Sequence, residues 1–248
     1  MKRDIRSWGN IFNKEVEEIN FPIGDQFVLS FGNQNSYGDS SLPLNNFTVK
    51  NTYVNKNNYY LSPTTTINDY LLSKNKIIYG IPGKSNVTLA GAIASDTHGK
   101  DNLWGGGFHK NVDSILIRIN DEIIRASRTE NVDLFEATIG GYGLSGQIIG
   151  VKLRSNTDIF NSYITRYNFG NNVENLLDSF SFVKNNYWVG WVDLLDKKKK
   201  WISESSSPIR NNNYNFTSSK NDFSDIPMGL AFVVKNRLKS LSFINNFY

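Results

Sequence analysis

One glycine-rich stretch, residues 81–112, decides the fold; it reads IPGKSNVTLAGAIASDTHGKDNLWGGGFHKNV. It contains both histidines of the chain, His98 and His109, among glycines and other small residues. Glycine lets a backbone approach a ligand closely, and successive exposed N–H groups form a concavity that binds phosphate. The small apolar run at 90–94, followed by polar residues at 95–98, therefore favours a cofactor with a flat ring and a pyrophosphate. The alternative is a glycine-rich loop that only connects two structural elements.

Two further glycine turns favour the ligand-binding interpretation. The first, FGNQNSYGD at 31–39, lies upstream, and the last, GGYGLSG at 140–146, lies downstream. The turns at 31–39 and 81–99 both follow expected strands, and loops in such positions often carry ligand-contacting backbone. We therefore expect the three turns to converge on one ligand.

Four ordered motifs carry a resemblance to a known family: SYGD at 36–39, PG at 82–83, VTLAGAIASDTHGK at 87–100 and ATIGGYGLSG at 137–146. They resemble the FAD-binding oxidoreductases of the vanillyl-alcohol oxidase superfamily, also called PCMH-type FAD-binding proteins, and most closely the decaprenylphosphoryl-β-D-ribose oxidase type. The resemblance implies an α+β fold. A two-subdomain FAD-binding domain would occupy residues 1–156, and a partial antiparallel-sheet substrate or cap domain would occupy residues 157–248.

The resemblance also implies a cofactor, FAD, and the residues that contact it. The FAD would be bound non-covalently, because the chain has no cysteine and the first turn has no histidine. The contacts are mostly backbone and small-residue contacts. They are assigned to Gly32, Ser36, Tyr37, Gly38, Asp39, Gly83, Thr88, Leu89, Ala90, Gly91, Ser95, Asp96, Thr97, His98 and Ile148.

The chain departs from the family pattern in three places. Residues 13–26 contain Pro22 and Gly24, which leave little room for the helix of the family's first βαβ unit. In the first turn, Gln34 and Asn35 stand where the family has a second glycine and an arginine. Family members also extend further, so we expect a C-terminal truncation that removes the family's catalytic lysine and a flavin-contacting tyrosine.

No catalytic residue can therefore be assigned, but His98 and Lys100 are candidates for the flavin or substrate side. His98 could lie beside the flavin ring, or it could be a hydrogen-bonded structural histidine. Lys100 could steer a phosphorylated sugar or face solvent. His109 is expected to be structural. No metal site is expected, because the two histidines are not accompanied by a cluster of carboxylates.

The amino-acid composition indicates the general class of protein to which the chain belongs. The 248 residues can bury a sizeable core, and 39% hydrophobic and 20% charged residues are typical of a globular protein. The net charge is +4, with one basic run at Lys197–Lys200 that could contact nucleic acid or anionic lipid, or could simply be a solvated turn. The chain has no apolar segment of about 18 residues and no signal-peptide pattern. We expect a cytoplasmic protein with at most peripheral membrane contact.

Local patterns predict the elements around these turns. The expected strands are residues 27–31, 59–62, 148–153 and 187–194, a strand lies within 42–54, and residues 115–124 form a hairpin. The expected helices are residues 66–73 with Thr66 as cap, 129–138 with Thr129 or Asn131 as cap, 173–183 and 230–248. Residues 203–225 are expected to form a polar loop, and the domain boundary is expected at about 155–160.

The function implied by the resemblance is oxidation of a secondary alcohol of a sugar or polyprenyl-phosphoryl sugar, with hydride transfer to flavin N5. The alternative is a catalytically incomplete flavin-binding or interaction module, truncated or split from such an enzyme. The expected partners are a small sugar or lipid-linked sugar, and a reductase or epimerase subunit or a separate C-terminal lobe. Nucleic acid is not expected as a partner.

Overall fold

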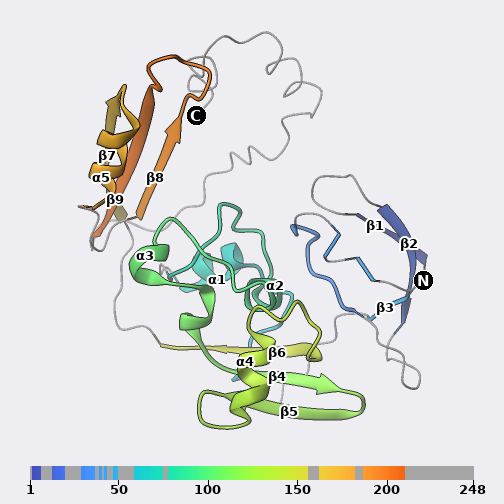
Figure 1. The fold of residues 1–248 in the computed structure, drawn as a ribbon. Helices are drawn as coiled ribbons and strands as arrows, with labels where there is room; N and C mark the ends of the chain where they lie inside the picture. Colours follow the sequence, from blue (N-terminus) through green and yellow to red (C-terminus); the bar gives the residue numbers. More distant parts are fainter. Residues whose placement is uncertain are drawn as a thin grey trace. The chain divides into compact units, whose positions relative to one another are not determined.

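The computed structural model describes residues 2–6, 13–19, 29–36, 39–40, 42–43, 47–49, 59–74, 78–155, 162–181 and 187–209. The chain divides into two compact units, Met1–Ile159 and Phe160–Tyr248, which are described separately below (Figure 1). The described residues combine short helices with sheets in which every strand pair except one is antiparallel. The two-subdomain FAD-binding architecture and its domain limits stay predictions.

The first sheet of unit 1 contains β1 (Lys2–Arg6), β2 (Asn13–Ile19) and β3 (Phe47–Val49). β1 and β2 are antiparallel, whereas β2 and β3 are parallel. The strand β3 lies in the stretch 42–54, where a strand was predicted. Ile5 and Val16 are buried, and the buried Thr48 hydroxyl donates a 2.8 Å hydrogen bond to the carbonyl of Leu29. This bond ties the sheet to the start of the first glycine turn.

The second sheet has the order β5-β4-β6 and is entirely antiparallel. β4 (Val112–Ile119) and β5 (Glu122–Ser127) form the predicted hairpin, and Asn120 in its turn has φ 52°. β6 (Gln147–Leu153) confirms the strand predicted after the third glycine turn. The pairing of β4 with β6 changes register between Leu116 and Ile117, which is a β-bulge.

The described part of unit 1 also has five short helical segments: α1 (Ile67–Lys74), α2 (Leu89–Ala94), α3 (Asn102–Gly105), the 3-10 helix η1 (Phe108–Asn111) and α4 (Val132–Thr138). α2 packs on β6, and α4 packs on β5. The core of unit 1 lies among these elements. Its largest fully buried side chains include Phe108, Phe135, Ile67, Leu89, Ile93, Ile115, Ile117 and Ile149.

The helices confirm some predictions and correct others. Thr66 caps α1 as predicted, because its Oγ1 accepts a 3.0 Å hydrogen bond from Asp69 N. Asn131, one of the two residues predicted to cap α4, occupies the cap position, but it has φ 47° and makes no side-chain cap bond. The predicted strand at 59–62 is wrong, since only Leu61 forms an isolated bridge there, to Val151.

The described residues of unit 2 form a three-stranded antiparallel sheet of order β7-β9-β8 and one helix. Its elements are β7 (Ser162–Gly170), α5 (Val173–Ser181), β8 (Tyr187–Val192) and β9 (Trp201–Ile209). α5 and β8 confirm the predicted helix and strand. Phe180 of α5 packs against Trp188 with ring centroids 4.6 Å apart, and Leu176 of the same helix is buried.

The strand β9 corrects the predicted polar loop at 203–225, of which residues 203–209 belong to the strand. This serine-rich segment lacks an apolar pattern, but it lies at the centre of the sheet and pairs with β7 on one side and β8 on the other. Ser203 and Ser206 are accordingly buried. The remainder of that predicted loop and the helix predicted at 230–248 lie outside the described residues. None of the helices in the described part of the chain combines the length and apolar character needed to span a bilayer.

Candidate functional site

The glycine turns converge on the short helix α2. At its beginning, Asn33 Nδ2 of the first turn donates a 2.8 Å hydrogen bond to the carbonyl of Asn86. Gly32 lies so close to the helix cap that an added Cβ would be 2.6 Å from Thr88 Oγ1. The absence of a side chain at Gly32 therefore allows the first turn to meet α2.

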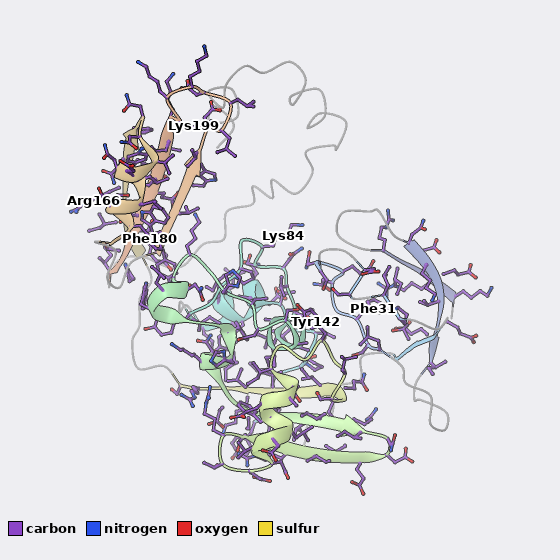
Figure 2. All side chains as sticks on the ribbon, in the orientation of Figure 1. Phe31, Lys84, Tyr142, Arg166, Phe180 and Lys199 are labelled. Atoms are coloured by element: carbon purple, nitrogen blue, oxygen red, sulfur yellow. The ribbon has the colours of Figure 1, made fainter. Side chains whose placement is uncertain are left out.

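The third turn contacts the other end of the same helix. Gly140 N donates to the carbonyl of Ile93 at 3.0 Å, and Tyr142 N donates to that of Ala94 at 2.8 Å. These bonds satisfy carbonyl groups that the end of a helix leaves without intrahelical partners. A Cβ added at Gly143 would lie 3.2 Å from Leu29, the residue that leads into the first turn. Tyr142 and Phe31, labelled in Figure 2, mark the two turns.

The segment 90–94 forms a helix rather than an open wall, although the sequence favoured a backbone lying flat against a ring. Its N–H groups are already bonded within the chain. Those of residues 89–91 donate to the carbonyls of Thr65 and Pro63 and to Thr88 Oγ1, at 2.8, 3.1 and 3.1 Å respectively. In this conformation, a ligand would be contacted by atoms other than these N–H groups.

In the first turn, the backbone at position 34 adopts a conformation typical of glycine, although the residue there is glutamine. Gln34 has φ 56°, a conformation that glycine adopts at less cost than other residues. Its Oε1 accepts a 2.9 Å hydrogen bond from Arg6 N in β1, which fixes where the side chain lies. Ser36 is half-buried and Asp39 is exposed, whereas Tyr37 and Gly38 lie outside the described residues.

The turn around His98 is assembled by a buried carboxylate that sequence reasoning did not single out. Asp101 is fully buried, and its Oδ2 and Oδ1 accept hydrogen bonds of 3.0 and 3.3 Å from Gly80 N. An added Cβ at Gly99 would lie 2.7 Å from Asp101 Oδ1, and one at Gly105 would be 2.5 Å from Oδ2. Its position between two glycines was the available signal, because small neighbours leave room for a buried acid.

Burial raises the pKa of Asp101 above its usual value. The bond from Gly80 N and the charges of His98 and Lys110 act in the opposite direction, but they are weaker influences. The Asp101 carboxyl group thus connects the segment before the Pro-Gly turn to the segment that carries His98.

A second carboxylate, Asp96, holds the other histidine. Asp96 has φ 39°, and His109 Nδ1 lies 2.8 Å from its Oδ1 and 2.9 Å from its Oδ2. His109 N also donates to Oδ1 at 3.1 Å. Both side chains are 30% exposed. Asp96 therefore fixes η1 beside the end of α2, and His109 has hydrogen-bond partners of the kind expected of a structural histidine.

The remaining candidate residues differ in their exposure to solvent. His98 and Lys100 are exposed, Ser95 and Thr97 are half-buried, and Ile148 is buried in β6. Gly83 is exposed, and an added Cβ there would meet no heavy atom within 4 Å. The structure thus brings the turns at 31–36, 86–98 and 140–146 together around α2. Their contact with FAD stays a prediction.

Comparison with known proteins shows similarity over part of the chain. No protein-family model matches the chain. Over 71 residues, the chain is 41% identical to the decaprenylphosphoryl-beta-D-ribose oxidase of Mycolicibacterium smegmatis (strain ATCC 700084 / mc(2)155). The aligned part is 28% of this chain and 15% of that protein, so the chain spans a small share of its relative's length. Over that part, the chain is similar to a segment of an oxidase.

Proposed function

We propose that this chain is a flavin-binding part of an oxidoreductase that oxidises a secondary alcohol of a sugar or polyprenyl-phosphoryl sugar. The observation that carries the proposal is the convergence of the turns at 31–36, 86–98 and 140–146 on α2, joined by hydrogen bonds at both ends of the helix. The partial similarity to a decaprenylphosphoryl-beta-D-ribose oxidase supports the same chemistry.

The arrangement of these turns fits a dinucleotide cofactor in some respects and restricts how it would be held. Backbone without a side chain is available at Gly83, which borders open space, whereas Gly32 is packed against Thr88. The N–H groups at the start of α2 and those of residues 95–97 are bonded within the chain, so we expect the first turn and the side chains of the segment 95–98 to make the principal contacts. When bound, FAD would supply the hydride acceptor, while the protein supplies binding, orientation and electrostatics.

The exposed His98 and Lys100 are the described residues that we expect on the substrate side. A lysine close to a phosphorylated sugar would interact with the phosphate as a point charge. His98 would hydrogen-bond the substrate or adjust the charge beside the ring. Asp101 would position both residues indirectly, because its carboxylate binds Gly80 N and packs beside Gly99.

A second candidate function is a flavin-binding or interaction module that is catalytically incomplete by itself. The aligned relative is matched over only 15% of its length. In this candidate, the catalytic groups of a complete enzyme would be supplied by another lobe or subunit. A separate lobe, or a reductase or epimerase subunit, would be the partner. This candidate predicts the same cofactor site without turnover by this chain.

One experiment separates these outcomes. The purified chain is incubated with FAD, freed of unbound cofactor by gel filtration, and its visible absorption is recorded. Bound flavin that is bleached anaerobically by a sugar alcohol supports the enzyme, and bound flavin that is not bleached supports the module. A colourless protein whose melting temperature and FAD fluorescence are unchanged by mixing contradicts both.

A further inference from the structure

The end of the unit 2 sheet where β8 turns into β9 exposes apolar and basic side chains together. Leu194 and Leu195 in the connecting loop are 71% and 70% exposed, and the four lysines Lys197–Lys200 that follow are exposed as well. Figure 2 shows Lys199 at this tip, with basic side chains extending from it. Two adjacent leucines that are largely exposed to water at a basic turn are unusual for a loop whose only role is to connect two strands.

Aromatic side chains continue the apolar surface onto the sheet. Ile202 of β9 pairs with Phe169 of β7 on one side and with Trp191 of β8 on the other, so the three lie in one row on the same face. Phe169 is 72% exposed and Trp191 is 37% exposed. We call Phe169, Trp191, Leu194, Leu195 and Lys197–Lys200 the basic apolar end of unit 2.

The loop holds these residues in a defined shape. The buried Asp193 accepts hydrogen bonds from the N–H groups of Leu195 and Asp196, at 2.9 and 3.1 Å. Asp193 N donates to the carbonyl of Lys200 at 2.8 Å and closes the turn. The loop is therefore organised by its own polar groups, while its leucines are left outside. A loop that already has a defined shape loses little conformational entropy when it binds a partner surface.

The roles of the four lysines differ. Lys199 Nζ donates a 2.6 Å hydrogen bond to the carbonyl of Leu194, and Lys200 Nζ pairs with Asp196 at 3.3 Å, so both brace the loop. Lys197 and Lys198 are exposed beside them. Asp196 offsets the charge of Lys200, so the net positive charge at this tip comes from Lys197, Lys198 and Lys199.

We propose that the basic apolar end of unit 2 is a membrane-contact site, which inserts Leu194 and Leu195 into the interface of an anionic bilayer while the lysines contact lipid headgroups. Apolar side chains flanked by lysine, with an aromatic residue at the boundary, match the interfacial layer of a bilayer. The proposal does not depend on flavin binding.

Lipid fits this surface better than nucleic acid does. Nucleic-acid binding needs cations spaced along phosphates and gains nothing from exposed aliphatic residues, whereas a bilayer uses both. Each lysine near an anionic membrane surface strengthens binding by about fivefold. The leucines are therefore the residues that distinguish the two kinds of partner.

The test is co-sedimentation of the full chain with vesicles, with and without added FAD. We expect binding to vesicles of phosphatidylcholine containing about one third phosphatidylglycerol, and much weaker binding to phosphatidylcholine alone. The double variant Leu194→Ser/Leu195→Ser should bind at least about tenfold more weakly. Lys197→Gln/Lys198→Gln should bind about 25-fold more weakly and lose much of the salt dependence.

Leu177→Ser is the matched control, because Leu177 is 62% exposed on α5 of the same unit but lies outside the basic apolar end. It should bind vesicles as the unchanged protein does. Melting curves by circular dichroism show whether each variant is folded. The chain has no cysteine, so a Leu195→Cys variant carries a unique thiol for an environment-sensitive fluorophore, whose emission should shift to the blue on anionic vesicles.

Three results would overturn the proposal. The unchanged protein could fail to sediment with anionic vesicles while the fluorophore at position 195 gives no shift. The leucine variant could bind as tightly as the unchanged protein, which would mean purely electrostatic adhesion. Duplex DNA could be retained through Lys197 and Lys198 with no vesicle binding, which would assign the surface to nucleic acid.

Discussion

At the scale of single residues, the structure depends on the close approach of the backbone of Gly99 to Ile81 and Asp101. An added Cβ would overlap the carbonyl oxygen of Ile81 and lie 2.7 Å from Asp101 Oδ1. Because a backbone oxygen cannot move aside as a flexible side chain can, we expect Gly99→Ala to lower the free energy of unfolding by about 2–3 kcal/mol. Urea unfolding followed by circular dichroism measures the change.

Gly83→Ala is the matched control, since Gly83 has open space beside it. That variant should be neutral or stabilised by about 0.5 kcal/mol, because alanine restricts the unfolded chain. If the two variants are equally stable, the packing described between Gly99 and Ile81 is wrong.

The buried Asp101 predicts a pH dependence. Its pKa is higher in the folded protein than in the unfolded chain, so the folded protein binds the proton more tightly. Its contribution to stability is fully present below the unfolded pKa and is lost as the pH rises through the folded pKa. Relative to Asp101→Asn, the free energy of unfolding of the unchanged protein should therefore fall as the pH rises above about 4, the ordinary pKa of an aspartate.

The measurement is a series of urea titrations of both proteins across that range. Asparagine keeps an acceptor for Gly80 N and has nearly the same shape as aspartate, so the difference reports mainly on the charge. A difference in unfolding free energy that does not change with pH would show that burial does not perturb this carboxyl group.

At the scale of elements, α2 is held by its cap and by its neighbours. Thr88 is buried, and its Oγ1 accepts a 3.1 Å hydrogen bond from Gly91 N. Thr88→Val keeps the shape but removes the acceptor, so we expect a loss of about 1–2 kcal/mol in the free energy of unfolding. Thermal and urea unfolding measure it.

Thr129→Val serves as the comparison, because Thr129 is exposed and stands near α4 without capping it. That change should remain within about 0.5 kcal/mol. Equal losses in the two valine variants would contradict the role of Thr88 as a cap.

The elements that the sequence predicted well are those with a clear apolar period. The hairpin of β4 and β5 and the helix α5 follow from isoleucine alternation and from helical spacing, which local sequence encodes. The helix α2 was not predicted, because alanine and glycine show no contrast between faces and its first N–H groups bond to residues 63–65. The strand β9 was missed because serines form a strand there only through pairing on both sides.

At the scale of the whole molecule, the convergence of the turns makes a prediction for FAD binding. The turns at 31–36 and 140–146 are hydrogen-bonded to the segment 86–98, so a ligand held by one of them should restrain all three. With FAD about a hundredfold above its Kd, the stabilisation would be about 2.7 kcal/mol. Hydrogen exchange followed by mass spectrometry should show slower exchange in all three turns.

Protection of a single turn, with the other two unchanged, would contradict the convergent site even if FAD binds. The membrane-contact proposal belongs to the same scale and is tested separately, because vesicle binding by unit 2 is measured with and without FAD.

The site could be predicted from the sequence only as a set of motifs. The glycines and the small residues showed which backbone could approach a ligand, and the resemblance indicated FAD. The contacts that assemble the turns join residues far apart in the chain, such as Asn33 with Asn86 and Leu29 with Gly143. No local pattern encodes such contacts, and Asp101 is recognisable as a buried acid only once Gly80 and Gly105 surround it.

The bulge between β4 and β6 limits how this sequence can change during evolution. A regular strand alternates between two faces, but in β6 the four consecutive residues 148–151 are all buried. None of these positions offers a solvent-facing side where a polar replacement would be harmless. In a saturation-mutagenesis library, we expect four adjacent intolerant positions here, whereas strand β5, on the other side of β4, should show tolerant positions at its exposed end.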